Sequence, residues 1–288
     1  LLDCKVFTMV NPLIGFGIPN WAWDIIALIL TFILILVLIR INDILRKREI
    51  IPIFVSRKVI HIFAGPIFLL CWLLFSGDIF SRYFAMIVPL LFVILFIGIG
   101  TGAIKNEEFV RTMSREGKAS ELLKGTLYYA LIMVISAIFF WFVPTDALGN
   151  PNFSIFIPTA FLIFGPLAGG DGFADLIGRR YGAHKFKIFA EKSIEGSLAM
   201  FFFSLLGTLG LLGVYWLILD PVYGSISIIA LIVPILTVTI VTTIIEMLSP
   251  RHTDNFLIPI AAIITIVVLF YLGFWPYPIG LLHLTSFP

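Results

Sequence analysis

Charged side chains are scarce in this sequence: they make up 12% of its 288 residues, whereas hydrophobic residues make up 60%. A soluble domain carries roughly 25% charged residues, so this composition, with a mean hydropathy of +1.09, excludes an ordinary soluble fold. Cysteine is also scarce, because Cys4 and Cys71 are too few and too far apart for a disulfide framework or a zinc knuckle. We therefore expect an integral membrane protein surrounded by lipid, with no nucleic-acid partner.

The motifs of soluble nucleotide-binding domains and of zinc enzymes are absent as well. The sequence contains no G-x-x-x-x-G-K-[ST] phosphate loop and no H-E-x-x-H metal motif. Gly98, Gly100 and Gly102 form a glycine run, but this run lacks the strand and helix that a dinucleotide fold places around it. Any nucleotide must therefore be held by a site at the membrane.

Eight runs of apolar residues are long enough, or nearly so, to span a bilayer. They are residues 21–39, 59–75, 83–100, 126–143, 153–170, 197–219, 224–245 and 256–275. Spans of about 20 apolar residues must be helical, because lipid offers no partner to backbone polar groups. The sequence thus predicts an all-α polytopic bundle that forms a single domain over residues 1–288, with residues 1–20 as an N-terminal extension. Pro166 and the Gly169–Gly170 pair are expected to break or kink the fifth span just before Asp171.

The distribution of lysine and arginine predicts the orientation of the bundle. The elaborate polar loops fall on one side of an eight-span topology: residues 40–58, 101–125, 171–196 and 246–255. This side holds 17 of the 19 Lys and Arg residues, and the other side holds Lys5 and Arg82. The positive-inside rule makes the first side cytoplasmic. We expect both termini on the opposite side and an active site that faces the cytoplasm.

Two aspartates follow the fifth span with a spacing of four. If the chain is helical after Gly172, Asp171 and Asp175 lie on one helix face, where two carboxylates repel unless a cation or a proton lies between them. Mg²⁺ is bound by one or two carboxylates together with substrate phosphates and water, so we predict a metal site here. The alternative is an ion pair between Asp175 and Arg179, which leaves Asp171 unexplained.

Cations are concentrated directly after these aspartates. Five of them lie within 14 residues and suit a polyphosphate: Arg179, Arg180, Lys185, Lys187 and Lys192. The alternative is the ordinary positive-inside bias together with anionic lipid headgroups. Ser193 or Ser197 is expected to cap the sixth span, whose N-terminal amides are suited to phosphate. Glu195, at the same boundary, is either a ligand or a surface charge.

Two further groups of polar residues lie at span boundaries. Arg57, Lys58 and His61 enter the second span with spacings of three and four, which place His61 on the same helix face as both cations. An ionisable group inside an apolar run is a functional candidate by default, and a packed interior histidine is an equal alternative. The turn of residues 246–255 carries two acids and an amide, and its alternative is a capped turn with solvated charges.

Together these segments resemble the membrane prenol kinases, the family of phytol, farnesol and dolichol kinases that is related to phosphatidate cytidylyltransferases. The matching segments are RKVIHIFAG at 57–65, ELLKGTLYY at 121–129, GGDGFADLIGRRYGAHKF at 169–186, KSIEGS at 192–197 and EMLSPRHTDN at 246–255. They span most of the chain in the expected order, and GDGFADLIGRRYG is the most specific of them. The resemblance is closest to the phytol kinase branch.

The resemblance implies transfer of the γ-phosphate of a nucleoside triphosphate, typically CTP, to the hydroxyl of a lipid alcohol, with Mg²⁺. Phytol, geranylgeraniol and a polyprenol are the expected acceptors. The alternatives are a phosphatidate cytidylyltransferase, which releases pyrophosphate, and a CTP-dependent diacylglycerol kinase. A lipid or anion transporter is an alternative of a different class, which requires polar residues along a path through both leaflets.

The predicted roles combine the residue patterns with this resemblance. The resemblance implies that the site contains Asp171, Asp175, Lys192, Glu246, Asp254 and Asn255. The candidates for catalysis are His61, Asp171, Glu246 and Asp254. The candidates for binding nucleotide or phosphate are Arg57, Lys58, Lys124, Arg179, Arg180, Lys185, Lys192, Ser193 and Asn255. The candidates for Mg²⁺ are Asp171, Asp175 and Glu195. The lipid tail is expected to enter laterally between helices, and the sequence leaves the lipid alcohol, the general base and the oligomeric state open.

Overall fold

The structure, a computed structural model, describes residues 11–78, 80–114, 117–140, 143–144, 154–155, 159–223, 228–250 and 253–275. Only the second half of the predicted N-terminal extension, residues 1–20, falls within these ranges. Both chain ends lie outside them, so the position of the termini on the non-cytoplasmic side stays a prediction.

The described part of the chain is mainly helical. The helices are α1 Asn20–Lys47, α2 Ile53–Cys71, α3 Ser81–Gly100, α4 Glu107–Met113, α5 Gly125–Phe139, α6 Thr159–Phe164, α7 Asp171–Tyr181, α8 Ile194–Tyr223, α9 Ile228–Leu248 and α10 Asp254–Tyr271. A π-helical stretch, Gly165–Gly170, joins α6 to α7. Short 3₁₀ turns lie at Ile14–Phe16, Trp72–Leu74 and Ala119–Leu123. Two small antiparallel sheets pair β1 Val143–Pro144 with β2 Ser154–Ile155 and β3 Lys185–Lys187 with β4 Glu191–Ser193.

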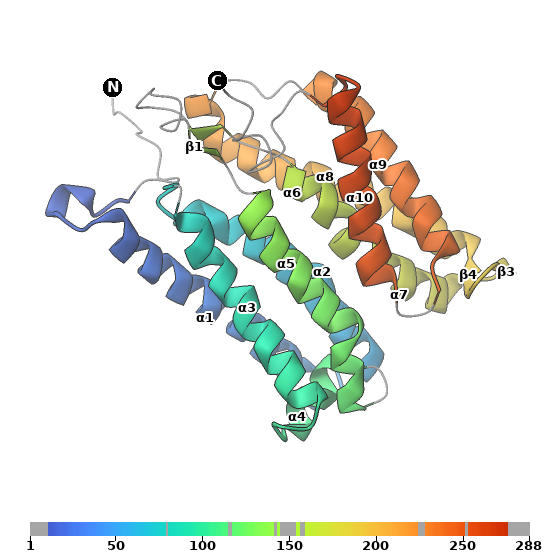
Figure 1. Ribbon diagram of the computed structural model, residues 1–288. Helices are drawn as coiled ribbons and strands as arrows, with labels where there is room; N and C mark the ends of the chain where they lie inside the picture. Colours follow the sequence, from blue (N-terminus) through green and yellow to red (C-terminus); the bar gives the residue numbers. More distant parts are fainter. Residues whose placement is uncertain are drawn as a thin grey trace.

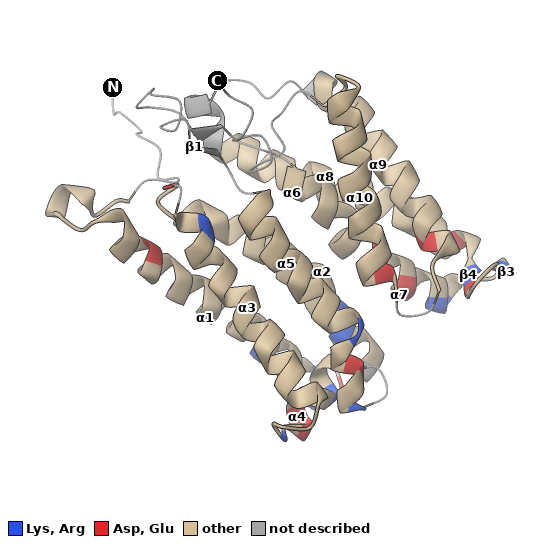
Figure 2. Ribbon diagram, in the orientation of Figure 1, with Lys and Arg blue, Asp and Glu red and all other residues tan. Residues whose placement is uncertain are grey.

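Within the described residues, eight helical segments are long and apolar enough to cross a membrane, which confirms the predicted polytopic all-α bundle. In Figure 1, α1, α3 and α5 run side by side with α2 behind them, while α9 and α10 lie next to each other. Figure 2 shows that charged residues gather at one end of the bundle, around α4 and from α7 to β4. The assignment of this end to the cytoplasm stays a prediction.

Two boundaries differ from the sequence-based prediction. α2 begins at Ile53, before the predicted residue 59, so Arg57 and Lys58 lie on a helix and not in a loop. α7 extends to Tyr181, so the first part of the predicted loop 171–196 is helical and belongs to the fifth span. Hydropathy misses both extensions because it assigns charged residues to loops, whereas charges that are paired inside the protein can be carried on helices.

The fifth span does not break at its proline and glycines. Residues Gly165–Gly170 continue the helix with π-type turns that lead directly into α7 at Asp171. Pro166 has no N–H to donate and its ring crowds the preceding turn, and the wider π turn accommodates both within a continuous helix. The predicted break or kink takes the form of a π-helical irregularity and not of a break, and the same helix that crosses the bundle carries Asp171.

The glycines of this stretch let α8 pack directly against it. A Cβ atom at Gly169 would lie 2.6 Å from the backbone oxygen of Phe203, and one at Gly207 would lie 3.2 Å from that of Gly165. A Cβ atom at Gly165 would overlap Thr208. Small residues of this kind let membrane helices approach closely. Because α7 continues from the stretch, this contact also fixes the position of α7 beside α8.

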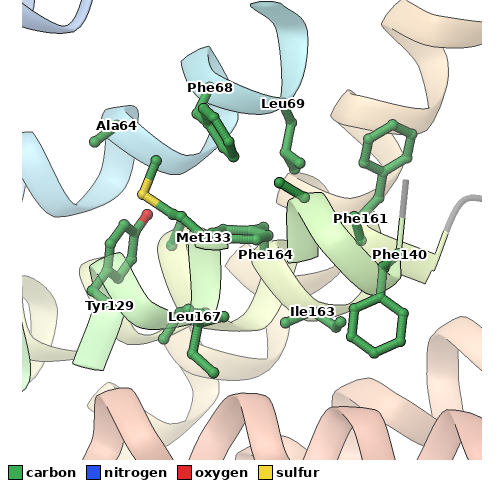
Figure 3. Close-up of a cluster of buried hydrophobic side chains, with 14 of the residues drawn as sticks. Ala64, Phe68, Leu69, Tyr129, Met133, Phe140, Phe161, Ile163, Phe164 and Leu167 are labelled. Atoms are coloured by element: carbon green, nitrogen blue, oxygen red, sulfur yellow. The ribbon is translucent and has the colours of Figure 1, made fainter. Parts of the chain in front are cut away.

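The opposite face of the fifth span packs into the hydrophobic core. Phe161, Phe164 and Leu167 are buried, and Figure 3 shows them in one cluster with Phe68 of α2 and Tyr129 of α5. The rings of Phe164 and Tyr129 meet edge to face, with centroids 6.0 Å apart. In the apolar window of this span 72% of the residues are buried, compared with at most 50% in the other seven. The fifth span is thus the central helix of the bundle.

Replacing Gly169 by alanine should destabilise the fold, because the added methyl group would press against the Phe203 carbonyl; overpacking of this kind costs about 1–3 kcal/mol. Gly210→Ala is a matched control, since Gly210 lies on α8 with no atom within 4 Å of its Cβ position. Alanine there gains up to about 1 kcal/mol of helix propensity. Thermal unfolding in detergent should show a lower midpoint for G169A and an unchanged or higher midpoint for G210A. Equal midpoints would contradict the packing role of Gly169.

Candidate active site

A cleft of about 720 Å³ lies where α7, the β3–β4 hairpin, the start of α8 and the facing ends of α9 and α10 meet. Its volume is within the range of about 300–1,000 Å³ that is typical of small-molecule sites. The polar side chains that line it are Asp171, Asp175, Arg179, Lys185, Glu191, Lys192, Ser193, Ser197, Glu246 and Asp254. The cleft therefore brings together most of the residues that the charge pattern singled out.

One wall of the cleft contains a buried cluster of ionisable side chains. The Lys58 Nζ atom lies 3.0 Å from Asp171 Oδ2 and 3.5 Å from Asp175 Oδ2. The His61 Nε2 atom lies 3.1 Å from the same Asp171 oxygen. Lys58 and Asp171 are each 3% exposed, so each charge is compensated by its partner and not by water. Removing one member of such a pair leaves an uncompensated buried charge.

The proton position on His61 follows from its neighbours. The Nε2 atom lies 2.8 Å from the Leu167 carbonyl oxygen as well as 3.1 Å from Asp171 Oδ2. Both neighbours are acceptors, so Nε2 carries a proton, and in the neutral imidazole Nδ1 is the acceptor. Tyr129 holds the other side of the residue: its hydroxyl donates to the His61 carbonyl oxygen at 2.8 Å, and its ring centroid lies 4.5 Å from the imidazole. His61 is thus fixed in one orientation and one tautomer.

Asp175 has two cationic partners. Arg179 Nε donates to its Oδ1 atom at 2.6 Å, and Lys58 lies near its Oδ2 atom. The alternative ion pair between Asp175 and Arg179 is therefore present, and Asp171 and Asp175 both line the cleft. A lysine lies beside both carboxylates, and among the residues that the structure describes no group of three or more His, Cys, Asp or Glu side chains is arranged to hold a metal ion. The Mg²⁺ site stays a prediction.

The opposite wall is organised around Lys192. Its Nζ atom lies 2.5 Å from Glu246 Oε1 and 3.6 Å from Asp254 Oδ2, and Ser249 Oγ donates to the other oxygen of Asp254 at 3.1 Å. Burial by itself would lower the pKa of Lys192, but the two carboxylates outweigh it and raise the pKa above its ordinary value of 10.5. The stability that the folded protein gains from the charged Lys192 is therefore complete below pH 10.5, and it is lost only as the pH rises through the raised pKa. Lys192 is a permanent cation of the cleft.

The start of α8 presents hydroxyl groups to the cleft. Ser193 caps the helix, as one of the two predicted caps, because its Oγ accepts a hydrogen bond from the Gly196 N–H at 3.1 Å. The Oγ atom of Ser197 and the Oε2 atom of Glu246 are buried without a hydrogen-bond partner among the described residues. Buried polar atoms are normally paired, so these two atoms are available to a polar ligand in the cleft.

Glu195, Arg180 and Lys124 are among the predicted residues that do not line the cleft. The Glu195 carboxylate accepts hydrogen bonds from the His184 backbone N–H at 3.2 Å and contacts His184 Nδ1 at 2.7 Å, so the structure does not bring it to the two aspartates. Arg180 is exposed and lies over the Tyr181 ring, 5.4 Å from its centroid. Lys124 is also exposed. Their predicted roles in binding stay untested.

Arg57 and Asn255 line a different cavity, which is mostly apolar and lies between α1, α2, α3 and α5. Asn255 Nδ2 donates to the Gly125 carbonyl oxygen at 2.8 Å. A Cβ atom at Gly125 would lie 3.0 Å from the Arg57 guanidinium, so this glycine lets the two polar side chains converge. His61 lines the same cavity. The predicted phosphate-binding set is therefore divided between two cavities.

Sequence reasoning missed the two groups that orient His61. Tyr129 is the last residue of the matching segment ELLKGTLYY, but its contact with His61 spans 68 positions of the chain and was not predicted. Leu167 acts through its backbone oxygen, so its side-chain type carries no signal. The proline and glycines around Leu167 indicate irregular backbone. This irregularity is the signal in the sequence that a carbonyl group there can accept a hydrogen bond from a side chain such as His61.

Lys58→Met should destabilise the protein by about 3–5 kcal/mol, because it leaves the Asp171 carboxylate buried without its ammonium partner. Arg179→Met is the matched control, since the Arg179 side chain is 49% exposed and an exposed pair contributes about 0–1 kcal/mol. Thermal unfolding in detergent at pH 7 should show a much larger decrease of the midpoint temperature for K58M than for R179M. Similar losses for both variants would contradict the buried-pair assignment.

Comparisons with known proteins place the chain in a family. No protein-family model and no solved structure matches it significantly. It is 33% identical over 242 residues to a probable chloroplastic phytol kinase of Zea mays, covering 81% of this chain and 72% of that protein. It is 34% identical over 239 residues to probable phytol kinase 1 of Oryza sativa, covering 81% and 70%, and 33% identical over 227 residues to phytol kinase 1 of Arabidopsis thaliana, covering 76% and 68%. The chain therefore belongs to the phytol kinase family, as its sequence motifs predict.

Proposed function

We propose that this protein transfers the γ-phosphate of CTP to the hydroxyl of a prenol such as phytol, geranylgeraniol or a polyprenol. The family supports a lipid-alcohol kinase, and one observation supports the location of the chemistry. His61 contacts Asp171, which lines the charged cleft, and it also lines the apolar cavity. A single imidazole thus adjoins both a polar site suited to a nucleotide and an apolar site suited to a lipid.

The cleft offers three features that suit a triphosphate. Lys192 is a permanent cation, and Arg179 and Lys185 line the same space. The cap and first turn of α8 line the cleft at Ser193, Gly196 and Ser197, and the positive end of the helix dipole favours phosphate there. The Ser197 hydroxyl adds a buried donor without a partner among the described residues. We infer that the phosphates lie between α7 and the start of α8.

The cleft also suits Mg²⁺ as the cofactor of the reaction. Magnesium is held by one or two carboxylates, with water and substrate phosphates as its other ligands, so a three-carboxylate cage is not required. Asp171 and Asp175 would hold it, and the unpaired Oε2 atom of Glu246 is a further oxygen in the same cleft. When bound, the ion would neutralise charge on the β- and γ-phosphate oxygens.

The remaining chemistry is assigned to His61. The alcohol oxygen forms a bond to the γ-phosphorus while the bond from that phosphorus to the β–γ bridging oxygen breaks, and the nucleoside diphosphate leaves. The transition state is loose, so the hydroxyl proton is transferred late, to Nδ1 of His61. Asp171 accepts the Nε2–H hydrogen bond and stabilises the imidazolium that forms. Glu246 and Asp254 are less suited to this role, because both already hold Lys192.

The direct test uses purified protein, Mg²⁺ and CTP labelled either at the γ- or at the α-phosphate, with phytol, diacylglycerol or phosphatidate. We expect γ-label in phytol, release of CDP, and no turnover when Mg²⁺ is chelated. Pyrophosphate release and α-label in lipid, with phosphatidate as the acceptor, would instead identify a cytidylyltransferase. Label in diacylglycerol alone would identify a diacylglycerol kinase, and no turnover with any nucleotide would leave transport as the better hypothesis.

His61→Gln should lower kcat by about 10²–10⁴-fold, which is the usual contribution of general-base catalysis. Asp171→Asn should lower it at least as much, because this carboxylate both orients His61 and is a proposed Mg²⁺ ligand. Glu107→Gln is the control, since the Glu107 side chain is 91% exposed on α4. Initial rates at saturating CTP, measured at a temperature at which each variant remains folded, provide the comparison, because D171N also removes the buried partner of Lys58. Near-normal turnover in H61Q would exclude His61 as the base.

A further inference from the structure

The apolar cavity between α1, α2, α3 and α5 has a volume of about 60 Å³. Its polar lining residues are Arg57, His61, Thr126, Tyr129 and Asn255. Arg57, Thr126 and Asn255 lie in the first two turns of α2, α5 and α10, at the charged end of the bundle. The other walls are apolar and include Ile35, Val88, Phe92, Phe96, Ala130 and Met133. The cavity is therefore an apolar chamber with one polar end.

We propose that this cavity binds the hydroxyl-bearing end of the lipid alcohol and selects acceptors by the shape of their first isoprene unit. The inference rests on the proposed kinase function. Sites that enclose a whole small molecule measure about 300–1,000 Å³, so a cavity of 60 Å³ is suited to the first isoprene unit and not to the whole lipid alcohol. The rest of a twenty-carbon chain does not fit and lies in the surrounding lipid.

The polarity of the cavity determines the orientation of this unit. Its carbon atoms gain from burial against the apolar walls, and its hydroxyl gains a partner only at the polar end. His61 lies one helical turn beyond Arg57 on α2, and the same ring contacts Asp171 of the cleft. A hydroxyl beside His61 therefore adjoins the proposed phosphate site, while the carbon atoms point away from it.

Two consequences for specificity follow. Phytol and geranylgeraniol carry the same methyl-branched allylic first unit and differ only beyond it, so their kcat/KM values should agree within about tenfold. Diacylglycerol carries an ester on the carbon next to its hydroxyl-bearing carbon, and this branch exceeds the cavity. The proposal therefore excludes diacylglycerol as an efficient acceptor on steric grounds.

The test compares acceptors within each variant, so that the fraction of active protein cancels. One methylene group in an apolar pocket changes kcat/KM by about 10–200-fold. Ala130→Val narrows the cavity and should lower the kcat/KM ratio of phytol to unbranched 1-hexadecanol by about tenfold or more. Phe92→Ala widens the cavity and should favour a bulkier acceptor. For a phytol analogue with an extra methyl group at C2, the kcat/KM value relative to that of phytol should rise by about tenfold or more.

The chain offers a matched control for each variant. Ala137 lies on α5 like Ala130 and is fully buried, but it does not line the cavity. Phe68 on α2 is likewise fully buried outside the cavity lining. Ala137→Val and Phe68→Ala should lower thermal stability and leave both acceptor ratios at their wild-type values. Unchanged ratios in A130V and F92A, with a wild-type protein that phosphorylates phytol, would overturn the cavity assignment and leave the kinase function intact.

A binding measurement covers the case in which wild-type protein transfers no phosphate. Phytol with a photoactivatable diazirine in its first isoprene unit should crosslink to residues 88–96 and 126–133 in the absence of nucleotide. Phytol with the diazirine at its distal end should label lipid-facing positions instead. Crosslinks from both probes to the same surface, outside these two ranges, would overturn the proposal independently of turnover.

Discussion

The buried ion pair between Lys58 and Asp171 is the interaction on which the fold and the candidate site both depend. Two charges that are each 3% exposed must meet, and they lie on helices that are distant in the sequence. α2 meets this requirement by beginning at Ile53, which places Lys58 in its second turn. The fifth span meets it by staying helical through Pro166. Local propensity opposes this continuation, and the cost of an unpaired buried charge favours it.

Backbone contacts between glycines set the position of the two walls of the cleft. The π-helical stretch packs against α8 at Gly165 and Gly169, and farther along a Cβ atom at Gly178 would lie 3.4 Å from the Cα atom of Gly196. These contacts place α7, with its aspartates, directly beside the first turn of α8, with its serines. Side chains can change rotamer, whereas helices in backbone contact are fixed relative to each other. The relative position of carboxylates and hydroxyls is therefore a property of the helix packing.

Composition predicts the architecture well because a bilayer allows few solutions. Eight apolar runs predict eight helices, and the clustering of polar residues at span boundaries predicts that Asp171, Lys192 and Glu246 share one site. The sequence pattern could not predict which polar residues line a second cavity. Arg57 and Asp171 both lie at the boundary of an apolar run, so the pattern does not distinguish them. The sequence pattern also could not place Glu195. A charged residue at a span boundary gives the same pattern whether its side chain faces the cleft or a neighbouring histidine. These distinctions depend on helix rotation, which is set by long-range packing.

The two cavities also bear on the choice between an enzyme and a transporter. A transporter needs a polar path through both halves of the membrane, whereas the walls of the apolar cavity are formed mostly by residues such as Ile35, Val88 and Met133. A kinase for a lipid alcohol has a different problem, because its donor dissolves in water and its acceptor in lipid. Under the proposed function, separate cavities of opposite polarity, with His61 lining one and contacting Asp171 of the other, would solve this problem without a continuous passage. Only the hydroxyl group then has to reach the boundary, and the apolar chain never has to enter the charged cleft.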